Sequence, residues 1–353
     1  MNESVLETVG SPLVRVGSPE GSTVAAKLES RNPGGSAKDR PALAMVRAAE
    51  RAGRLTEGDR VVEATSGNTG IGLAMVCAAL GYDLTVVMPR SKSEERRRLI
   101  RAYGAEIRLV DDGMDSARAR ADAVADETGA VQLRQFENPA NPDSHYRGTG
   151  AEILDQVGDR EIDALVAGVG TGGTLTGTAR RLLERFPEMS VVAVEPAANP
   201  VVSRGEPAAD DYQGMGPDFI SDNVDLDLID DVEAVPFDAA EAECRRLARE
   251  EGVLVGQSSG AASVAARRVA GRLADPGLEC PPAPEVEPDL DADDPAVEPE
   301  PESDPGSVGR ETVGTDGGYD DCPLVVTVFW DSGERYLSAG TFDAQQSNPE
   351  SDR

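Results

Sequence analysis

The chain alternates between short apolar runs and helix-length segments, and this alternation constrains the fold more than any other feature. Parallel strands need long crossover connections, usually helices, so repeated β-to-α switching is typical of parallel sheets. The sequence predicts an α/β protein with doubly wound parallel sheets. The expected strands are 13–16, 23–28, 60–64, 84–88, 106–110, 131–136, 164–169, 191–195, 253–255 and 324–330, and the expected helices are 40–52, 68–80, 93–103, 116–127, 152–157, 175–186, 238–251 and 261–273.

Two stretches interrupt this alternation. Asn138–Pro142 contains two prolines, which continue neither a helix nor a strand, and we place a crossing between domains there. The expected domains are a smaller, mobile unit of residues 38–145 and a larger unit of residues 1–37 and 146–353. Residues 275–321 are rich in proline, aspartate, glutamate and glycine, which predicts an acidic, disordered insertion.

Three turns, each between a predicted strand and a predicted helix, are rich in glycine or small polar residues: 168–174, 65–70 and 256–260. Amides at a helix N-terminus bind anions, particularly where glycine lets the backbone approach a ligand. The first turn, with Gly170, Thr171, Gly172, Gly173 and Thr174, is a candidate phosphate site. The second, with Thr65, Ser66, Asn68 and Thr69, suits a carboxylate or another small anion.

Lys38 follows a glycine-containing turn, and only three of the 34 lysine and arginine residues are lysines. A lysine in a dry pocket can lose its proton and act as a nucleophile or base, whereas arginine stays charged. Two anion sites beside such a lysine suggest a phosphorylated cofactor and an amino-acid carboxylate. Pyridoxal phosphate fits this description, with Ser258 as the candidate partner of its ring nitrogen.

A second interpretation rests on the first turn alone. Residues 168–173 also satisfy the G-x-G-x-x-G pattern, and Glu195 follows at the end of the next predicted strand. A nicotinamide-dependent dehydrogenase is therefore the alternative from a different class of enzyme.

The net charge of -31 excludes an electrostatic affinity for nucleic acid or anionic membranes, which require basic surfaces. No apolar run is long enough to span a membrane, and we expect a cytoplasmic protein. The four cysteines form no C-x-x-C pair and there is one histidine, so neither disulfides nor a metal site are expected.

Several other residues have plainer interpretations. His145 is expected to be structural rather than catalytic, and Cys77 to lie in the core. Arg96, Arg97 and Arg98 are expected on a solvated helix face, with an anionic-substrate role as the weaker alternative. Ser259 is expected to cap a helix.

Six stretches together resemble the cysteine synthases (O-acetylserine sulfhydrylases), which belong to the β-family of pyridoxal phosphate enzymes. They are NPGGSAKDRPAL at 32–43, EATSGNTG at 63–70, QFENPANPDSHY at 135–146, GVGTGGTLTG at 168–177, GQSSGAA at 256–262 and SGERYLS at 332–338. The resemblance implies fold type II, with the cofactor between two α/β domains. The acidic composition and scarcity of lysine make the chain haloarchaeal-like.

The resemblance also implies roles for these residues. Lys38 would bind the cofactor covalently and take the substrate's α-proton. Asn68 would contact the cofactor's 3'-oxygen and Ser258 its ring nitrogen, while Gly170, Thr171, Gly172, Gly173 and Thr174 would bind its phosphate. The substrate carboxylate would be held by Thr65, Ser66, Thr69 and Gln135.

The implied reaction is the conversion of O-acetylserine and sulfide to cysteine and acetate, in a homodimer with serine acetyltransferase as a possible partner. Departures from the family pattern at Gly148, Gly216, Pro217 and Gln257 leave the substrate open. Cystathionine β-synthase activity, with serine and homocysteine, and an O-phosphoserine sulfhydrylase are the alternatives within the same chemistry.

Overall fold

The larger of two sheets carries the N-terminal strands and the last strand of the fold. The computed structural model describes residues 1–278, 280 and 321–343. In this sheet the order is β1-β2-β10-β7-β8-β9, with β1 antiparallel to β2 and all other pairs parallel. The strands are β1 (Leu13–Val16), β2 (Thr23–Leu28), β7 (Ala164–Gly168), β8 (Ser190–Pro196), β9 (Asp231–Val235) and β10 (Leu324–Phe329).

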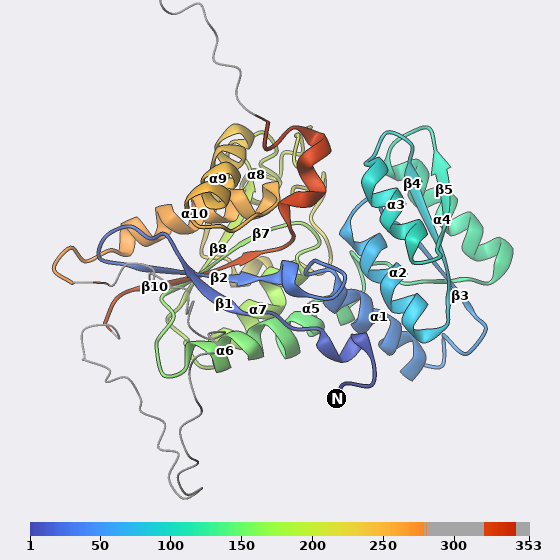
Figure 1. The fold of residues 1–353 in the computed structure, drawn as a ribbon, viewed down its shortest axis with the longest axis horizontal. Helices are drawn as coiled ribbons and strands as arrows, with labels where there is room; N and C mark the ends of the chain where they lie inside the picture. Colours follow the sequence, from blue (N-terminus) through green and yellow to red (C-terminus); the bar gives the residue numbers. More distant parts are fainter. Residues whose placement is uncertain (279, 281–320, 344–353) are drawn as a thin grey trace, which may run out of the picture.

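The smaller sheet is entirely parallel, in the order β5-β4-β3-β6. Figure 1 shows it with α2, α3 and α4 on one side of the molecule, while the larger sheet lies on the other side with α7, α9 and α10. Its strands are β3 (Arg60–Ala64), β4 (Asp83–Pro89), β5 (Glu106–Val110) and β6 (Val131–Gln132).

Helices cover both faces of each sheet, as the continuous apolar strands require. In β7, Ala164 and Val166 join the core formed with α9 and α10, whereas Leu165 and Ala167 join the opposite core with α6 and α7. The α-helices are α1 (Asp39–Arg51), α2 (Asn68–Leu80), α3 (Glu94–Ala102), α4 (Met114–Thr128), α5 (Ala140–Ser144), α6 (Ala151–Val157), α7 (Gly173–Leu183), α8 (Val201–Arg204), α9 (Phe237–Glu250) and α10 (Gln257–Leu273). The 3₁₀-helices are η1 (Val5–Thr8), η2 (Glu29–Arg31), η4 (Leu226–Leu228) and η5 (Gly333–Ala339), and η3 (His145–Gly150) is a π-helix.

Two predicted strands are wrong in extent or kind. The strand expected at 131–136 ends at Gln132, because the next three backbone N–H groups donate to the buried Glu63 carboxylate at 3.0–3.2 Å instead of to a neighbouring strand. The strand expected at 253–255 is a single bridge between Val255 and Ser332. Conversely, edge strand β9 was not predicted, since Asp231 and Glu233 interrupt its apolar pattern.

The prediction that Asn138–Pro142 continues neither a helix nor a strand is wrong, because helix α5 begins at Ala140. Pro139 is the N-cap of α5, and Pro142 lies in its first turn, where a helix requires no N–H donor. Helical structure then runs through η3 into α6. The domain boundaries at 38 and 145 therefore stay a prediction.

The cysteine prediction needs correction, because Cys280 and Cys322 form a disulfide with their Cα atoms 5.9 Å apart. They lie 42 residues apart, so their spacing gave no signal. Residues 281–320, most of the predicted acidic insertion, lie outside the described residues. Cys77 is buried, as expected.

A buried ion network joins α1 to the larger sheet. The Arg40 guanidinium, which is 4% exposed, donates to Glu29 from Nε at 2.7 Å and to Glu152 from Nη1 at 2.6 Å. Lys27 Nζ donates to the same Glu152 at 2.7 Å. These cations favour ionisation of Glu152 strongly enough to lower its pKa to about 2, although burial alone raises that pKa. Two buried cations thus balance two carboxylates next to the turn that carries Lys38.

We expect Arg40→Met to lower the free energy of unfolding by about 3–5 kcal/mol, because it leaves the fully buried Glu29 without its cation. Arg47→Met on the same helix is the control, since the Arg47 side chain is 45% exposed, and it should cost less than about 0.5 kcal/mol. Urea denaturation measures both values. Equal losses would contradict the assigned role of the network.

Candidate active site

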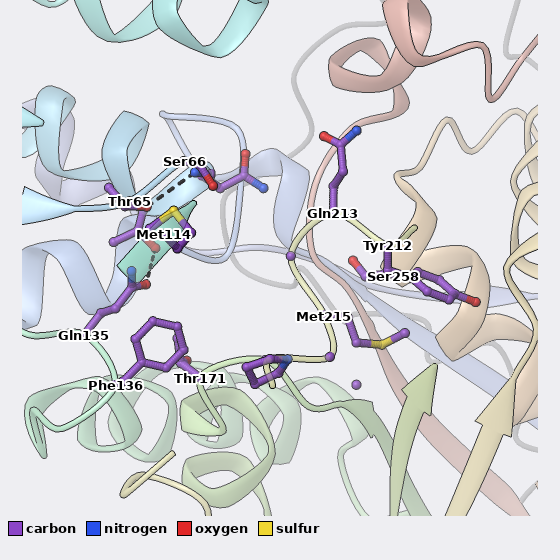
Figure 2. Close-up of a pocket in the computed structure, with 18 of the residues that line it drawn as sticks. Thr65, Ser66, Met114, Gln135, Phe136, Thr171, Tyr212, Gln213, Met215 and Ser258 are labelled. Atoms are coloured by element: carbon purple, nitrogen blue, oxygen red, sulfur yellow. Dashed lines mark hydrogen bonds between the residues drawn. The ribbon is translucent and has the colours of Figure 1, made fainter. Parts of the chain in front are cut away.

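The carboxyl ends of strands from both sheets border one cavity of about 450 Å³. Ligands bind at this edge of open parallel sheets. Figure 2 shows Thr65, Ser66 and Gln135 on one side of this cavity and Met215 and Ser258 on the other. All of the sequence-predicted site residues line it except Gly173, which starts α7 beside it.

Lys38 lies in this cavity at the start of α1. Its turn is fixed by backbone hydrogen bonds from Gly35 to Asn32 and from Ala37 to Trp330. Burial lowers the pKa of Lys38 from its ordinary value, while the charges of Asp331 and Glu29 oppose that shift. The amine is therefore easier to deprotonate than that of a surface lysine, as its predicted role requires.

The turn from Thr65 to Thr69 presents hydroxyls and amides at the N-terminus of α2. Thr69 Oγ1 donates to Gln135 Oε1 at 2.6 Å, and Gly67 N donates to Thr65 Oγ1 at 3.3 Å (Figure 2). Gln135 reaches the turn because Glu63 accepts the backbone N–H of Gln135 at 3.0 Å. These groups can hydrogen-bond the oxygens of a small carboxylate.

The Gly170–Thr174 turn forms a backbone cradle at the N-terminus of α7. Gly172 has φ +79°, and a side chain at this position would overlap Val224. A Cβ atom at Gly170 would lie 2.7 Å from the carbonyl oxygen of Gly214. The first amides of α7 have no intrahelical acceptor, so they are available to a phosphate. Thr171 and Thr174 add hydroxyls to the same cavity.

Ser258 lines the cavity from the first turn of α10 and is 7% exposed. Its neighbour Ser259 does not cap the helix as predicted, because its hydroxyl accepts the backbone N–H of Trp330 at 2.9 Å. That bond holds the end of β10 against α10.

Asn68 belongs to a hydrogen-bond network that the sequence analysis missed. Its Nδ2 donates to Asp331 at 2.6 Å, and its Oδ1 accepts from Arg335. Tyr336 also donates to Asp331, at 2.8 Å. Burial and the Asp331 charge raise the pKa of Tyr336 well above its ordinary value, so this hydroxyl stays protonated. Residues 331–336 follow a buried strand, a position that marks them as site candidates.

Arg96 is not on a solvated face, which corrects the plainer of its two interpretations. It is 4% exposed and lines the cavity, with its guanidinium carbon 5.4 Å from the Tyr336 ring centroid. The predicted helix was right, but Tyr336 of the C-terminal segment packs against this side chain. Arg98, by contrast, has an exposed side chain.

His145 is structural, as expected. Its Nδ1 lies 2.9 Å from Thr149 Oγ1, and its Nε2 lies 3.3 Å from Thr174 Oγ1. Burial, with the charges of Arg40 and Lys38, lowers the pKa of His145 well below its ordinary range. The neutral imidazole ring therefore contacts Thr174 of the Gly170–Thr174 turn.

The Glu195 carboxylate holds the chain that follows its own strand. Its carboxylate, 1% exposed, accepts the N–H groups of Val202 and Ser203 and the Ser203 hydroxyl, and so holds the start of α8. Glu195 does not line the cavity. The dehydrogenase interpretation thus loses the acidic residue on which it depended.

Within the described part of the chain, no cluster of histidine, cysteine, aspartate and glutamate could hold a metal ion. No described helix is long and apolar enough to cross a membrane. The residues present do fit pyridoxal phosphate: a lysine of lowered pKa, a glycine cradle at a helix N-terminus and a buried hydroxyl border the same cavity.

Comparison with known proteins agrees with this fit. Residues 6–277 match the family model described as pyridoxal-phosphate dependent enzyme. A cysteine synthase of Staphylococcus aureus is 48% identical over 269 residues, which are 75% of this chain and 87% of that relative.

Solved structures extend the likeness. O-ureido-L-serine synthase is 37% identical with a TM-score of 0.82, over 98% of this chain and 97% of its own. Cysteine synthase from Entamoeba histolytica is 29% identical with a TM-score of 0.81, over 98% of this chain and 92% of its own. The expected fold class, cofactor and enzyme class are confirmed, and the chain belongs to the pyridoxal-phosphate dependent enzyme family, in its cysteine synthase branch.

Proposed function

We propose that this protein is a cysteine synthase that converts O-acetylserine and sulfide into cysteine and acetate. The observation that carries the proposal is the meeting of Lys38 with two separate anion-binding turns in one cavity. One turn suits the cofactor phosphate and the other suits the carboxylate of an amino acid. The 48% identity to a cysteine synthase supports the same activity.

In this proposal each turn has one task. The cofactor phosphate would be bound by Gly170, Thr171, Gly172, Gly173 and Thr174. Asn68 would hydrogen-bond the 3'-oxygen, and Ser258 the ring nitrogen. Thr65, Ser66, Thr69 and Gln135 bind and orient the substrate carboxylate. Bound pyridoxal phosphate withdraws electrons from the substrate's α-carbon, which permits loss of the α-proton and of acetate from Cβ.

The Lys38 amine receives the α-proton, because its lowered pKa keeps part of the amine neutral. Ser258 would offer a neutral hydroxyl to the ring nitrogen. That would leave the nitrogen unprotonated and favour replacement at Cβ over transamination. We further propose that residues 38–145 close over the carboxylate and exclude water, and that the protein is a cytoplasmic homodimer. Serine acetyltransferase is the proposed partner.

The proposed donor and acceptor are tested by offering O-acetylserine, O-phosphoserine or serine with either sulfide or homocysteine. We expect the highest kcat/KM for O-acetylserine with sulfide, and a visible absorption band from the bound cofactor. A preference for homocysteine would favour cystathionine synthesis instead. A purified protein that is colourless and binds a nicotinamide cofactor would overturn the proposal.

Lys38→Ala is expected to lower cysteine formation by more than about 10²-fold while the protein remains folded, since it removes the proton-transfer group. Arg51→Ala, at the exposed far end of α1, is the control and should leave the rate unchanged. Cysteine formation and the melting temperature are measured for both variants. A Lys38→Ala protein that kept its activity would disprove the assignment.

Cofactor uptake by the cofactor-free protein should depend on pH through Lys38. Attachment needs the neutral amine, so the rate should rise with pH and level off below the ordinary lysine value of 10.5. Asp331→Asn removes a carboxylate that raises this pKa, and it should move the midpoint to lower pH. The growth of visible absorption measures the rate. A midpoint at or above 10.5 would contradict the prediction.

A further inference from the structure

Arg96 is a buried cation in the active-site cavity, and it has no ion-pair partner among the described residues. It lines the cavity from α3 with 4% of its surface exposed, and its Nε is buried with no hydrogen-bond partner. Its guanidinium forms no ion pair with any residue that the structure describes. A buried guanidinium left unpaired is costly, so its retention calls for a physical reason.

Contact with Tyr336 does not supply that reason. The guanidinium carbon lies 5.4 Å from the ring centroid, a distance at which a cation–π interaction is favourable. However, the tyrosine ring carries no net charge and accepts none of the guanidinium's hydrogen bonds. The contact orients Arg96 but leaves its charge uncompensated.

Other cations of the cavity differ from Arg96. Arg118 pairs with Asp115 at 2.7 Å. Lys92 is exposed, and its charge acts on Asp210, where it opposes the rise in pKa caused by burial. Lys38 faces Asp331. Among the described cavity residues, Arg96 is thus the buried arginine without a carboxylate partner.

The nearest candidate position for that anion is the Thr65–Thr69 turn. A Cβ atom built on Gly67, in the middle of this turn, would lie 3.8 Å from Arg96 Nη1. Thr65, Ser66, Thr69 and Gln135 offer hydrogen bonds but no positive charge. A carboxylate held there away from water needs a counter-charge as well as hydrogen bonds.

We propose that Arg96 supplies the positive charge that balances the α-carboxylate of the amino-acid substrate at the Thr65–Thr69 turn. The inference rests on the proposed function, because it takes the carboxylate site from it. Arg96 is then a specificity-determining residue that favours amino acids with a free carboxylate over their amides. In this proposal the Arg96 guanidinium gains its ion-pair partner when the substrate carboxylate binds.

The test compares binding of L-serine and L-serinamide, which differ only in the carboxylate. Both are titrated into the cofactor-loaded protein, and the change in visible absorption gives each Kd without any turnover. We expect Arg96→Met to weaken L-serine binding by about tenfold or more and to change L-serinamide binding by less than about twofold. Arg96→Lys, which keeps the charge, should recover most of the preference.

Arg98→Met is the matched control, because this arginine lies on the same helix with its side chain 77% exposed. It should bind both compounds as the unaltered protein does. If the Arg96→Met protein does not take up the cofactor, the same two titrations are done with Arg96→Gln. This variant removes the charge but keeps a polar side chain beside Tyr336.

The outcomes separate the two proposals. Equal weakening of both compounds, or no weakening, would overturn the role of Arg96 and leave the proposed function intact. Selective loss of O-phosphoserine binding would place the anion on the leaving group and also overturn it. An unaltered protein whose absorption responds to neither compound would remove the proposed function, and this inference with it.

Discussion

The ion pair between Arg40 and Glu29 fixes the position on which the rest of the site depends. Arg40 lies in the first turn of α1, two residues after Lys38, whereas Glu29 follows strand β2 of the larger sheet. Their contact holds the lysine-bearing turn at a set distance from the strand ends. Because the pair is buried, removing one partner lowers the free energy of unfolding by far more than the intact pair adds to it. Positional accuracy, rather than stability, is the gain.

The last strand of the fold links the two halves of the cavity. Beyond β10, Asp331 accepts from Asn68 and Tyr336, while Arg335 donates to both Asn68 and the Gly34 carbonyl. The Thr65–Thr69 turn, the Lys38 turn and the C-terminal segment thereby share one set of hydrogen bonds. Asn68 and the lysine turn are thus held by the same side chain, that of Arg335.

Local patterns were enough to predict most elements and the three strand-to-helix turns that border the cavity. Strand length, helix spacing and glycine position are all set by neighbours in sequence. The failures arose where distant residues decide. The burial of Arg96 depends on Tyr336, the early end of β6 depends on Glu63, and the Cys280–Cys322 bond depends on how α10 and β10 meet. The roles of Asp331 and Arg335 likewise appear only once β10 lies between β2 and β7.

That disulfide makes the fold insensitive to the length of the chain between its two cysteines. Cys280 follows α10 and Cys322 precedes β10, and their Cα atoms are held 5.9 Å apart. The ends of the connecting segment are therefore held at the same separation whatever its length. The entropy of closing a loop grows only slowly with its length. Evolution can therefore lengthen, shorten or replace this segment while β10, which precedes Asp331, keeps its register.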